Sequence, residues 1–275
     1  MILYFSGTGN SQAIALSLAK LTGDETHYCQ ANASPIDINH SSSLGFVFPV
    51  HAWGLPQFYE EYIKCILTQY FQSNNSSIQY VYMVCTCGDD IGKTDVLLEK
   101  LLRKYKLPLD SRFSVIMPNT YIGLPGFDTD NLDLVEQKLK NATTKVSQIA
   151  TIINQRIRGY QEINPGKFPW LKSYILRPLF HLRFTTTNRF HVDIEKCIGC
   201  GICSKVCPTQ NVMVSLNGPR IPHWNKYCTD CLACYHHCPH QCIEYGKFSK
   251  NKGQYVYKTS SIGTSQVDTG KESTI

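Results

Sequence analysis

The sequence has no long run of apolar residues. It also lacks a uniform excess of basic or acidic residues along its length. The longest stretches without a formal charge, 38–59 and 65–88, are broken by Pro, Gly, His or Ser/Asn clusters. None of them supplies the roughly 20 apolar residues that a membrane-spanning helix needs. Residues 1–150 carry 11 basic and 14 acidic groups, whereas residues 151–190 carry seven basic groups and one acidic group. Because the positive charge is confined in this way, we do not expect a nucleic-acid-binding protein.

We also expect no secretory leader. Met1 is followed directly by the strand-like residues 2–5, without a basic segment or a cleavage site. We therefore expect a cytoplasmic protein, in which thiols stay reduced. Thirteen cysteines, eight of them between Cys197 and Cys238, then indicate metal ligation rather than disulfide bonds.

Residues 1–158 alternate segments rich in Val, Ile, Tyr and Phe with segments whose apolar residues recur at three- and four-residue spacing. Such alternation is typical of parallel strands joined by helical crossovers. We predict a doubly wound α/β domain with a five-stranded parallel sheet. The expected strands are 2–5, 26–30, 44–50, 80–86 and 113–118, and the expected helices are 13–21, 57–67, 96–105 and 135–157.

Three further segments follow this domain. Residues 159–190 form a connector rich in aromatic and basic residues. Residues 191–246, too few to build a self-sufficient core, predict a small α+β domain that is held together by bound metal. Residues 247–275 are rich in Ser, Thr, Gly, Lys and Gln, and we expect them to be disordered.

The cysteines of residues 191–246 form two copies of the pattern C-x2-C-x2-C-x3-C-P, which begin at Cys197 and Cys228. Structural zinc sites use two ligand pairs separated by a long gap, so this spacing favours iron–sulfur clusters over zinc. The pattern resembles that of bacterial two-[4Fe-4S] ferredoxins, in which the fourth cysteine of each copy binds the other cluster. The resemblance implies one cluster on Cys197, Cys200, Cys203 and Cys238, and a second on Cys207, Cys228, Cys231 and Cys234. Leu232 departs from the glycine usual at its position, which Gly201 keeps, and Cys242 is a surplus cysteine.

A glycine loop follows the first expected strand and precedes a helix. Its residues are Ser6, Gly7, Thr8, Gly9, Asn10 and Ser11. Backbone N–H groups and hydroxyls at a helix N-terminus predict a phosphate site. The loop lacks the lysine of a Walker A motif and the third glycine of a dinucleotide fingerprint. It therefore favours a phosphate monoester that is held by amides and hydroxyls.

This loop resembles the phosphate loop of flavodoxin, and two other loops agree with that resemblance. The loop after the third strand is similar to the one whose Trp stacks on the flavin, and the loop after the fourth is similar to the Cys-Gly-Asp flavin loop. The resemblance implies FMN, bound by these loops at the carboxyl ends of the strands. The matching residues are His51, Ala52, Trp53, Gly54, Thr86, Cys87, Gly88 and Asp89. No aromatic residue follows Asp89 in the sequence Asp90-Ile91-Gly92, so we expect Tyr121 to cover the second flavin face.

The connector allows two interpretations. Its aromatic residues either pack between the two domains or, with the neighbouring basic residues, contact a membrane surface or an acidic partner. We favour packing between the domains, because Pro165, Pro169 and Pro178 are expected to prevent a long amphipathic helix. The aromatic residues are Phe168, Trp170, Tyr174, Phe180, Phe184 and Phe190.

The order of the two domains resembles a family of fused flavodoxin–ferredoxin electron-transfer proteins. It implies that electrons move between two [4Fe-4S] clusters and FMN, with a ferredoxin or an oxidoreductase as redox partner. Two alternatives stay open. One is an FMN reductase of a quinone or nitro-compound that the clusters supply with electrons, and the other is an iron–sulfur redox sensor. No catalytic residue is assigned.

Overall fold

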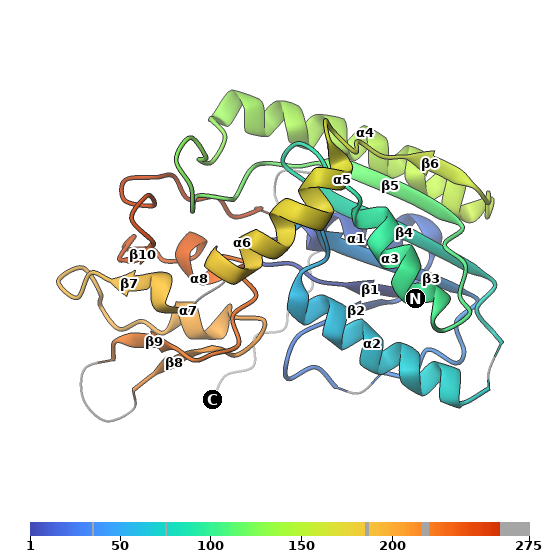
Figure 1. The fold of residues 1–275 in the computed structure, drawn as a ribbon, viewed down its shortest axis with the longest axis horizontal. Helices are drawn as coiled ribbons and strands as arrows, with labels where there is room; N and C mark the ends of the chain where they lie inside the picture. Colours follow the sequence, from blue (N-terminus) through green and yellow to red (C-terminus); the bar gives the residue numbers. More distant parts are fainter. Residues whose placement is uncertain (35, 75, 185–186, 216–219, 259–275) are drawn as a thin grey trace, which may run out of the picture.

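A computed structural model describes residues 1–258, apart from residues 35, 75, 185–186 and 216–219. Figure 1 shows two parts side by side: an α/β domain on the right and a small domain with short helices and strands on the left. Residues 259–275, which include most of the tail expected to be disordered, lie outside the described residues.

A six-stranded parallel sheet forms the centre of the α/β domain, in the order β2-β1-β3-β4-β5-β6. The first five positions follow the flavodoxin-like doubly wound order, so the predicted fold is confirmed. The sixth strand extends the sheet beyond the five that were predicted. Its three residues are too few to show a periodicity, and it pairs with β5 at the sheet edge. The strands are β1 Ile2–Tyr4, β2 Thr26–Tyr28, β3 Ser43–Pro49, β4 Tyr80–Cys87, β5 Ser111–Ile116 and β6 Tyr160–Glu162.

Helices cover both faces of this sheet. Tyr59 and Leu98, from α2 and α3, belong to the core on one face. Leu18 and Val146, from α1 and α4, belong to the core on the other. Burial of apolar residues on both sides explains why the strands read as continuous hydrophobic runs. The helices are α1 Asn10–Thr22, α2 Gln57–Gln72, α3 Thr94–Arg103 and α4 Leu132–Asn154.

Among its described residues, the small domain has two pairs of antiparallel strands and two single-turn helices. Strand β10 pairs with β7, and β8 pairs with β9. Phe190 stacks on Trp224 with ring centroids 4.7 Å apart, and this pair joins the two strand pairs. The elements are β7 Phe190–Val192, α7 Ile202–Lys205, β8 Val212–Val214, β9 Pro222–Trp224, α8 Ala233–His236 and β10 Ile243–Tyr245.

The connector contains a long helical segment, which we did not predict. An α-turn Pro169–Leu171, a π-helix Lys172–Leu176 and the helix α6 Arg177–Phe184 follow one another without a break. Pro169 occupies the first turn, where no N–H is needed, and Pro178 follows a π-turn, which alters the local hydrogen bonding. The expectation that the prolines would prevent a long helix is therefore wrong. Figure 1 shows this yellow segment crossing the face turned to the viewer, between the two domains.

The interpretation that the connector's aromatic residues pack between the domains is wrong for three of the five whose side chains are described. Phe168 and Trp170 are 74% and 60% exposed, and Tyr174 is also exposed. Phe180 does contact a residue outside the connector, because its ring lies 5.8 Å from that of Tyr121. The side chain of Phe184 lies outside the described residues.

The first residues of the tail are ordered, contrary to expectation. Residues 252–257, hereafter the strap, run back across the α/β domain. Lys252 Nζ donates to three carbonyl oxygens, at 2.5–2.9 Å, of Ile122, Leu124 and Phe127. Composition did not reveal this ordering, since it depends on polar contacts with a distant loop.

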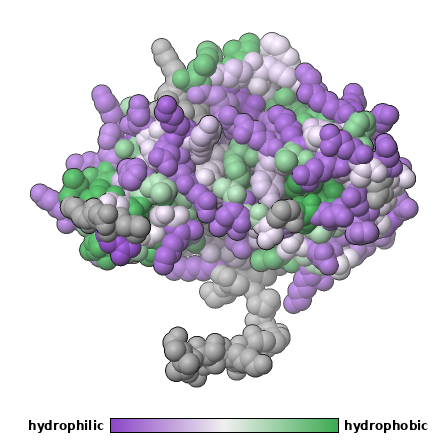
Figure 2. Space-filling model, turned by 90° about the horizontal axis from the view of Figure 1, so that it is seen from below, coloured by the Kyte–Doolittle hydropathy of each residue, from purple (hydrophilic) through white to green (hydrophobic). Residues whose placement is uncertain are grey.

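Among the described residues, no helix is both long enough and apolar enough to span a membrane. Hydrophobic surface does gather in places. Figure 2 shows such a patch at the left end of the molecule, over the small domain. Ile194 and Ile198 of that domain are 67% and 65% exposed.

Candidate functional site

A cavity of about 370 Å³ lies at the carboxyl ends of the strands, where the two domains meet. The glycine loop, the loop after β3 and the loop after β4 all line it, together with Tyr121. Gly9 and Gly54 are not lining residues, but they belong to two of these loops. The structure therefore brings the predicted flavin loops together at the switch point between β1 and β3.

The glycine loop leads into the N-terminus of α1, and its side chains are buried. Ser6 Oγ accepts a 3.1 Å hydrogen bond from Gly9 N, which stabilises the turn. Ser11 Oγ lies 2.8 Å from Thr86 Oγ1, so the loop is tied to the end of β4. Gly9 has a left-handed backbone, with φ of 95°, that other residues rarely adopt. The N–H groups of the first helical turn are left for an anion.

Asn10 holds the loop to two other segments. Its Nδ2 donates to Pro118 O at 3.0 Å, and its Oδ1 accepts a 2.9 Å hydrogen bond from the Tyr255 hydroxyl. Tyr257 N donates to Thr8 O at 2.8 Å. The strap is thus part of the site. Sequence reasoning missed it, and two tyrosines in a polar tail were the only available signal.

The wall of the cavity contains several strained residues. Ala52 and Trp53 have φ values of 45° and 57°, and Asp230 and Leu232 have values of 53° and 56°. All four line the cavity. Left-handed backbone in non-glycine residues costs free energy, and such residues concentrate at functional sites.

Asp90 provides a test of whether a flavin fits. Its Oδ2 forms a 2.5 Å ion pair with Lys172 Nζ, whereas its buried Oδ1 has no hydrogen-bond partner among the described residues. Both residues line the cavity. A buried acceptor without a donor is costly unless a ligand supplies one. The polar edge of a flavin carries such an N–H group, and a phosphate suits the glycine loop, so the residues present fit FMN.

The second cysteine repeat forms another wall of the same cavity, through Thr229, Asp230, Cys231 and Leu232. A Cβ atom added at Gly7 would lie 2.8 Å from Cys231 O and 2.9 Å from Cys231 Cβ. Only glycine therefore allows the phosphate loop to approach this cysteine so closely. The sequence did not indicate this contact between the two motifs.

His51 connects the loop after β3 to the cysteine repeat. Its Nδ1 donates to Thr229 O at 3.1 Å. The pKa of His51 is lowered to about 4, chiefly by burial; the hydrogen bond to Thr229 opposes the shift, and the nearby His181 and Arg177 add to it. His51 is therefore neutral near pH 7.

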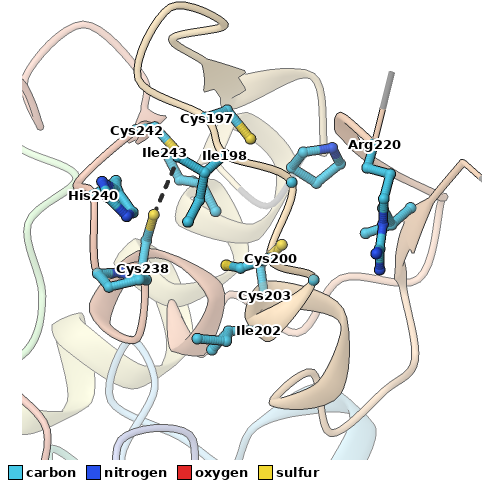
Figure 3. Close-up of a pocket in the computed structure, with 15 residues that line it drawn as sticks. Cys197, Ile198, Cys200, Ile202, Cys203, Arg220, Cys238, His240, Cys242 and Ile243 are labelled. Atoms are coloured by element: carbon cyan, nitrogen blue, oxygen red, sulfur yellow. Dashed lines mark hydrogen bonds between the residues drawn. The ribbon is translucent and has the colours of Figure 1, made fainter. Parts of the chain in front are cut away.

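The cysteines expected to bind the first cluster surround a separate small hollow. Cys197, Cys200, Cys203 and Cys238 all line it, and Figure 3 shows their side chains around its centre. Cys200 is exposed, whereas Cys203 and Cys238 are buried. Cys242 lines the hollow too, and its Sγ lies 3.3 Å from that of Cys238. The hollow and the flavin cavity share no lining residue, so they are separate.

The two repeats have matching backbones. Gly201 and Leu232 both precede a single-turn helix, and both are left-handed, with φ values of 74° and 56°. Leu232 is 3% exposed, so burial of its side chain offsets the strain that glycine avoids. Leucine in place of glycine also provides an apolar side chain to the flavin cavity, which Leu232 lines.

The arrangement of the thiols suits clusters better than single ions. Among the described residues, no three Cys, His, Asp or Glu side chains are close enough to hold one metal ion. Four sulfurs on one Zn²⁺ at 2.3 Å would stand about 4 Å apart, whereas a cube of iron and sulfide keeps its cysteines further apart. Burial raises the pKa of the Cys231 thiol well above its ordinary value, and iron binding would stabilise the thiolate there.

Comparisons with known proteins agree with these two parts. Residues 196–243 match the 4Fe-4S dicluster domain. An uncharacterized ferredoxin of Methanocaldococcus jannaschii is 41% identical over 54 residues, which are 19% of this chain and 70% of that protein.

Solved structures also resemble the α/β domain. A flavodoxin, WrbA-like protein from Agrobacterium tumefaciens is 13% identical, with a TM-score of 0.38 over 56% of this chain and 96% of that chain. The Trp repressor binding protein of Bacillus subtilis is 17% identical, with a TM-score of 0.37 over 54% and 96%. The fold itself is defined by the strand order rather than by these distant matches.

A doubly wound domain joined to paired cysteine quartets defines an iron–sulfur redox protein. The chain belongs to the two-[4Fe-4S] ferredoxins through its carboxy-terminal part, with a flavodoxin-like domain fused ahead of it. The predicted fused family and the predicted iron–sulfur clusters are confirmed.

Proposed function

We propose that this protein transfers electrons between its two clusters and an FMN bound in the cavity. One observation supports the proposal: Thr229–Leu232, which include the proposed cluster ligand Cys231, form a wall of the flavin cavity. The cluster on Cys207, Cys228, Cys231 and Cys234 would thus lie next to the flavin. The cluster on Cys197, Cys200, Cys203 and Cys238 would lie in the separate hollow, beside the exposed Cys200.

The division of labour follows from the chemistry of the groups. Each cluster exchanges one electron, whereas a flavin exchanges one or two electrons with protons. The chain's own contribution is to hold the groups in order and to keep water from the buried thiols. A redox protein such as a ferredoxin would exchange electrons at the exposed cluster, where Ile198 provides apolar contact surface.

The test uses protein purified without oxygen and analysed for iron, sulfide and flavin. We expect about eight irons, about eight sulfides and one FMN per chain. FMN should bind more tightly than riboflavin, because only FMN has the phosphate for the glycine loop. Equal affinity for FMN and riboflavin, or protein without flavin after reconstitution, would contradict the proposal.

A second function is favoured by one observation. Tyr121 contacts Phe127 and Phe180 at ring-centroid distances of 5.7 and 5.8 Å, and all three rings line the cavity. An aromatic wall of this kind would admit a flat, oxidised substrate such as a quinone or a nitro-compound. Steady turnover of a soluble quinone with reduced ferredoxin would indicate a reductase, whereas a pure electron carrier would show none.

A further inference from the structure

The helical segment of the connector has its polar and apolar sides reversed. A helix on a protein surface normally turns its apolar side to the core and its polar side to water. Here Ser173 is buried, and its Oγ donates to Trp53 O and accepts from Lys93 N, both at 2.8 Å. Arg177 Nη2 also faces the α/β domain and donates to Leu55 O at 2.9 Å.

Much of the rest of the segment's surface is apolar and exposed to solvent. Phe168, Trp170, Leu179 and Leu182 are 74%, 60%, 54% and 79% exposed. Leu171 and Ile175 are about 40% exposed and continue the same side at helical spacing. We call Phe168, Trp170, Leu171, Ile175, Leu179 and Leu182 the outer face.

The start of the outer face is held in an unusual conformation. Phe168 has a left-handed backbone, with φ of 52°, although it is a bulky residue at the surface. Such strain is costly, and solvent exposure of the ring gives nothing in return. An apolar partner for this ring would supply the missing stabilisation.

The formal charges of the helical segment have one sign. Between Glu162 and Asp193 the sequence has no carboxylate, but it has five Lys or Arg residues. Lys167, beside Phe168, is exposed. Lys172 and Arg177 already contact Asp90 and Glu60 beneath the segment. A partner for this surface should therefore offer apolar groups to the exposed apolar side chains and negative charge to the basic residues beside them.

We propose that the outer face binds peripherally to an anionic lipid bilayer, with its apolar side chains among the headgroups and upper acyl chains. Trp and Tyr are the side chains that favour this interface, and both occur here as Trp170 and Tyr174. A protein interface of standard size needs hydrogen bonds throughout. Three inward polar groups of the segment, Ser173 Oγ, Arg177 Nη2 and Lys172 Nζ, are already bonded to the α/β domain.

The same segment is also a wall of the flavin cavity, through Lys172, Phe180 and His181. Membrane contact would thus hold that wall beside the bilayer. The inference does not rest on the proposed function, because the outer face is exposed whether or not FMN is bound.

The test is co-sedimentation of the intact protein with vesicles of phosphatidylcholine alone, or with one quarter phosphatidylglycerol. We expect binding to the anionic vesicles that is at least tenfold tighter than to the neutral ones, and that weakens as salt is raised. The triple variant F168A/W170A/L182A should lose at least tenfold in affinity. Leu132, which is 82% exposed on α4, provides the matched control, and L132A should bind as the wild type does.

Two further measurements decide between occupants. On binding, Trp170 emission should shift to shorter wavelength and be quenched by brominated lipids, and W170F should lack that component. Because the three substituted side chains are exposed, the triple variant should fold normally. An iron content equal to that of the wild type checks this. Failure to bind anionic vesicles would overturn the inference. The inference would also be overturned if the wild type were a dimer and the triple variant a monomer, since the outer face would then be covered by a second copy.

Discussion

The Tyr255 hydroxyl donates a 2.9 Å hydrogen bond to Asn10 Oδ1, which joins residues 245 positions apart in the chain. Asn10 begins the helix that follows the glycine loop, so the contact fixes the loop from outside the α/β domain. Tyr255 N in turn donates to His236 Nδ1 at 3.2 Å. The strap therefore connects the small domain to the phosphate site.

Removal of this hydroxyl should weaken FMN binding. A lost buried hydrogen bond costs about 1 kcal/mol, so Y255F should bind FMN about fivefold less tightly. Fluorescence titration of the flavin-free protein measures the affinity. Tyr227 is 84% exposed, and Y227F serves as the control that should change nothing. Equal affinities for the two variants would show that the strap does not support the loop.

A methyl group at Gly7 should separate the phosphate loop from the cluster loop. The added Cβ would meet Cys231 O at 2.8 Å, so G7A should lose about 1–3 kcal/mol of unfolding free energy through overpacking. It should also slow flavin reduction by the clusters, which stopped-flow absorbance measures. Gly23 has φ of 74° and no neighbour within 4 Å. G23A should lose about 1 kcal/mol without slowing the transfer, and an equal slowing in G23A would refute the contact's role.

Cys242 should prove dispensable for both clusters despite its position. Its thiol lies 3.3 Å from Cys238 Sγ, yet it stands outside the repeated pattern. C242S should keep about eight irons per chain, whereas C231S should keep about four. Iron and sulfide analysis of protein purified without oxygen provides the counts. Loss of a cluster in C242S would make Cys242 a ligand.

The doubly wound fold was predictable because its signals are local. Runs such as 80–86 are hydrophobic throughout since both faces of β4 are buried. The cysteine spacing was equally informative, because three thiols in one short loop suit a cluster. Strand β6 and the helix through Pro178 were not predictable, since neighbouring segments rather than local periodicity stabilise them.

The site was predictable in its loops but not in its assembly. The phosphate loop and the loops at Trp53 and Cys87 carry their own residue patterns. The approach of Cys231 to Gly7 and the return of the strap to Thr8 depend on how distant segments pack. Phe168 and Trp170 were wrongly predicted to be buried, because aromatic composition alone does not reveal which side of a helix faces the core.

Neutral His51 should make the protein less stable as the pH falls. Its pKa is about 4 in the folded protein, because burial disfavours the charged ring, against about 6.5 in an unfolded chain. The contribution of His51 to the free energy of unfolding is therefore complete above about pH 6.5. It is lost as the pH falls towards 4, because only the unfolded chain takes up a proton in that range. The expected slope is about 1.4 kcal/mol per pH unit at most. Denaturant unfolding at pH 7, 6 and 5, under argon, measures it.

The variant H51N keeps a side-chain donor for Thr229 O but cannot titrate, so its stability should depend less steeply on pH. The side chain of His40 is 91% exposed, and H40N provides the matched control. This variant replaces an exposed side chain and should follow the wild-type pH dependence. If H51N and the wild type lost stability in parallel between pH 7 and 5, His51 would not be the buried neutral ring that its contacts indicate.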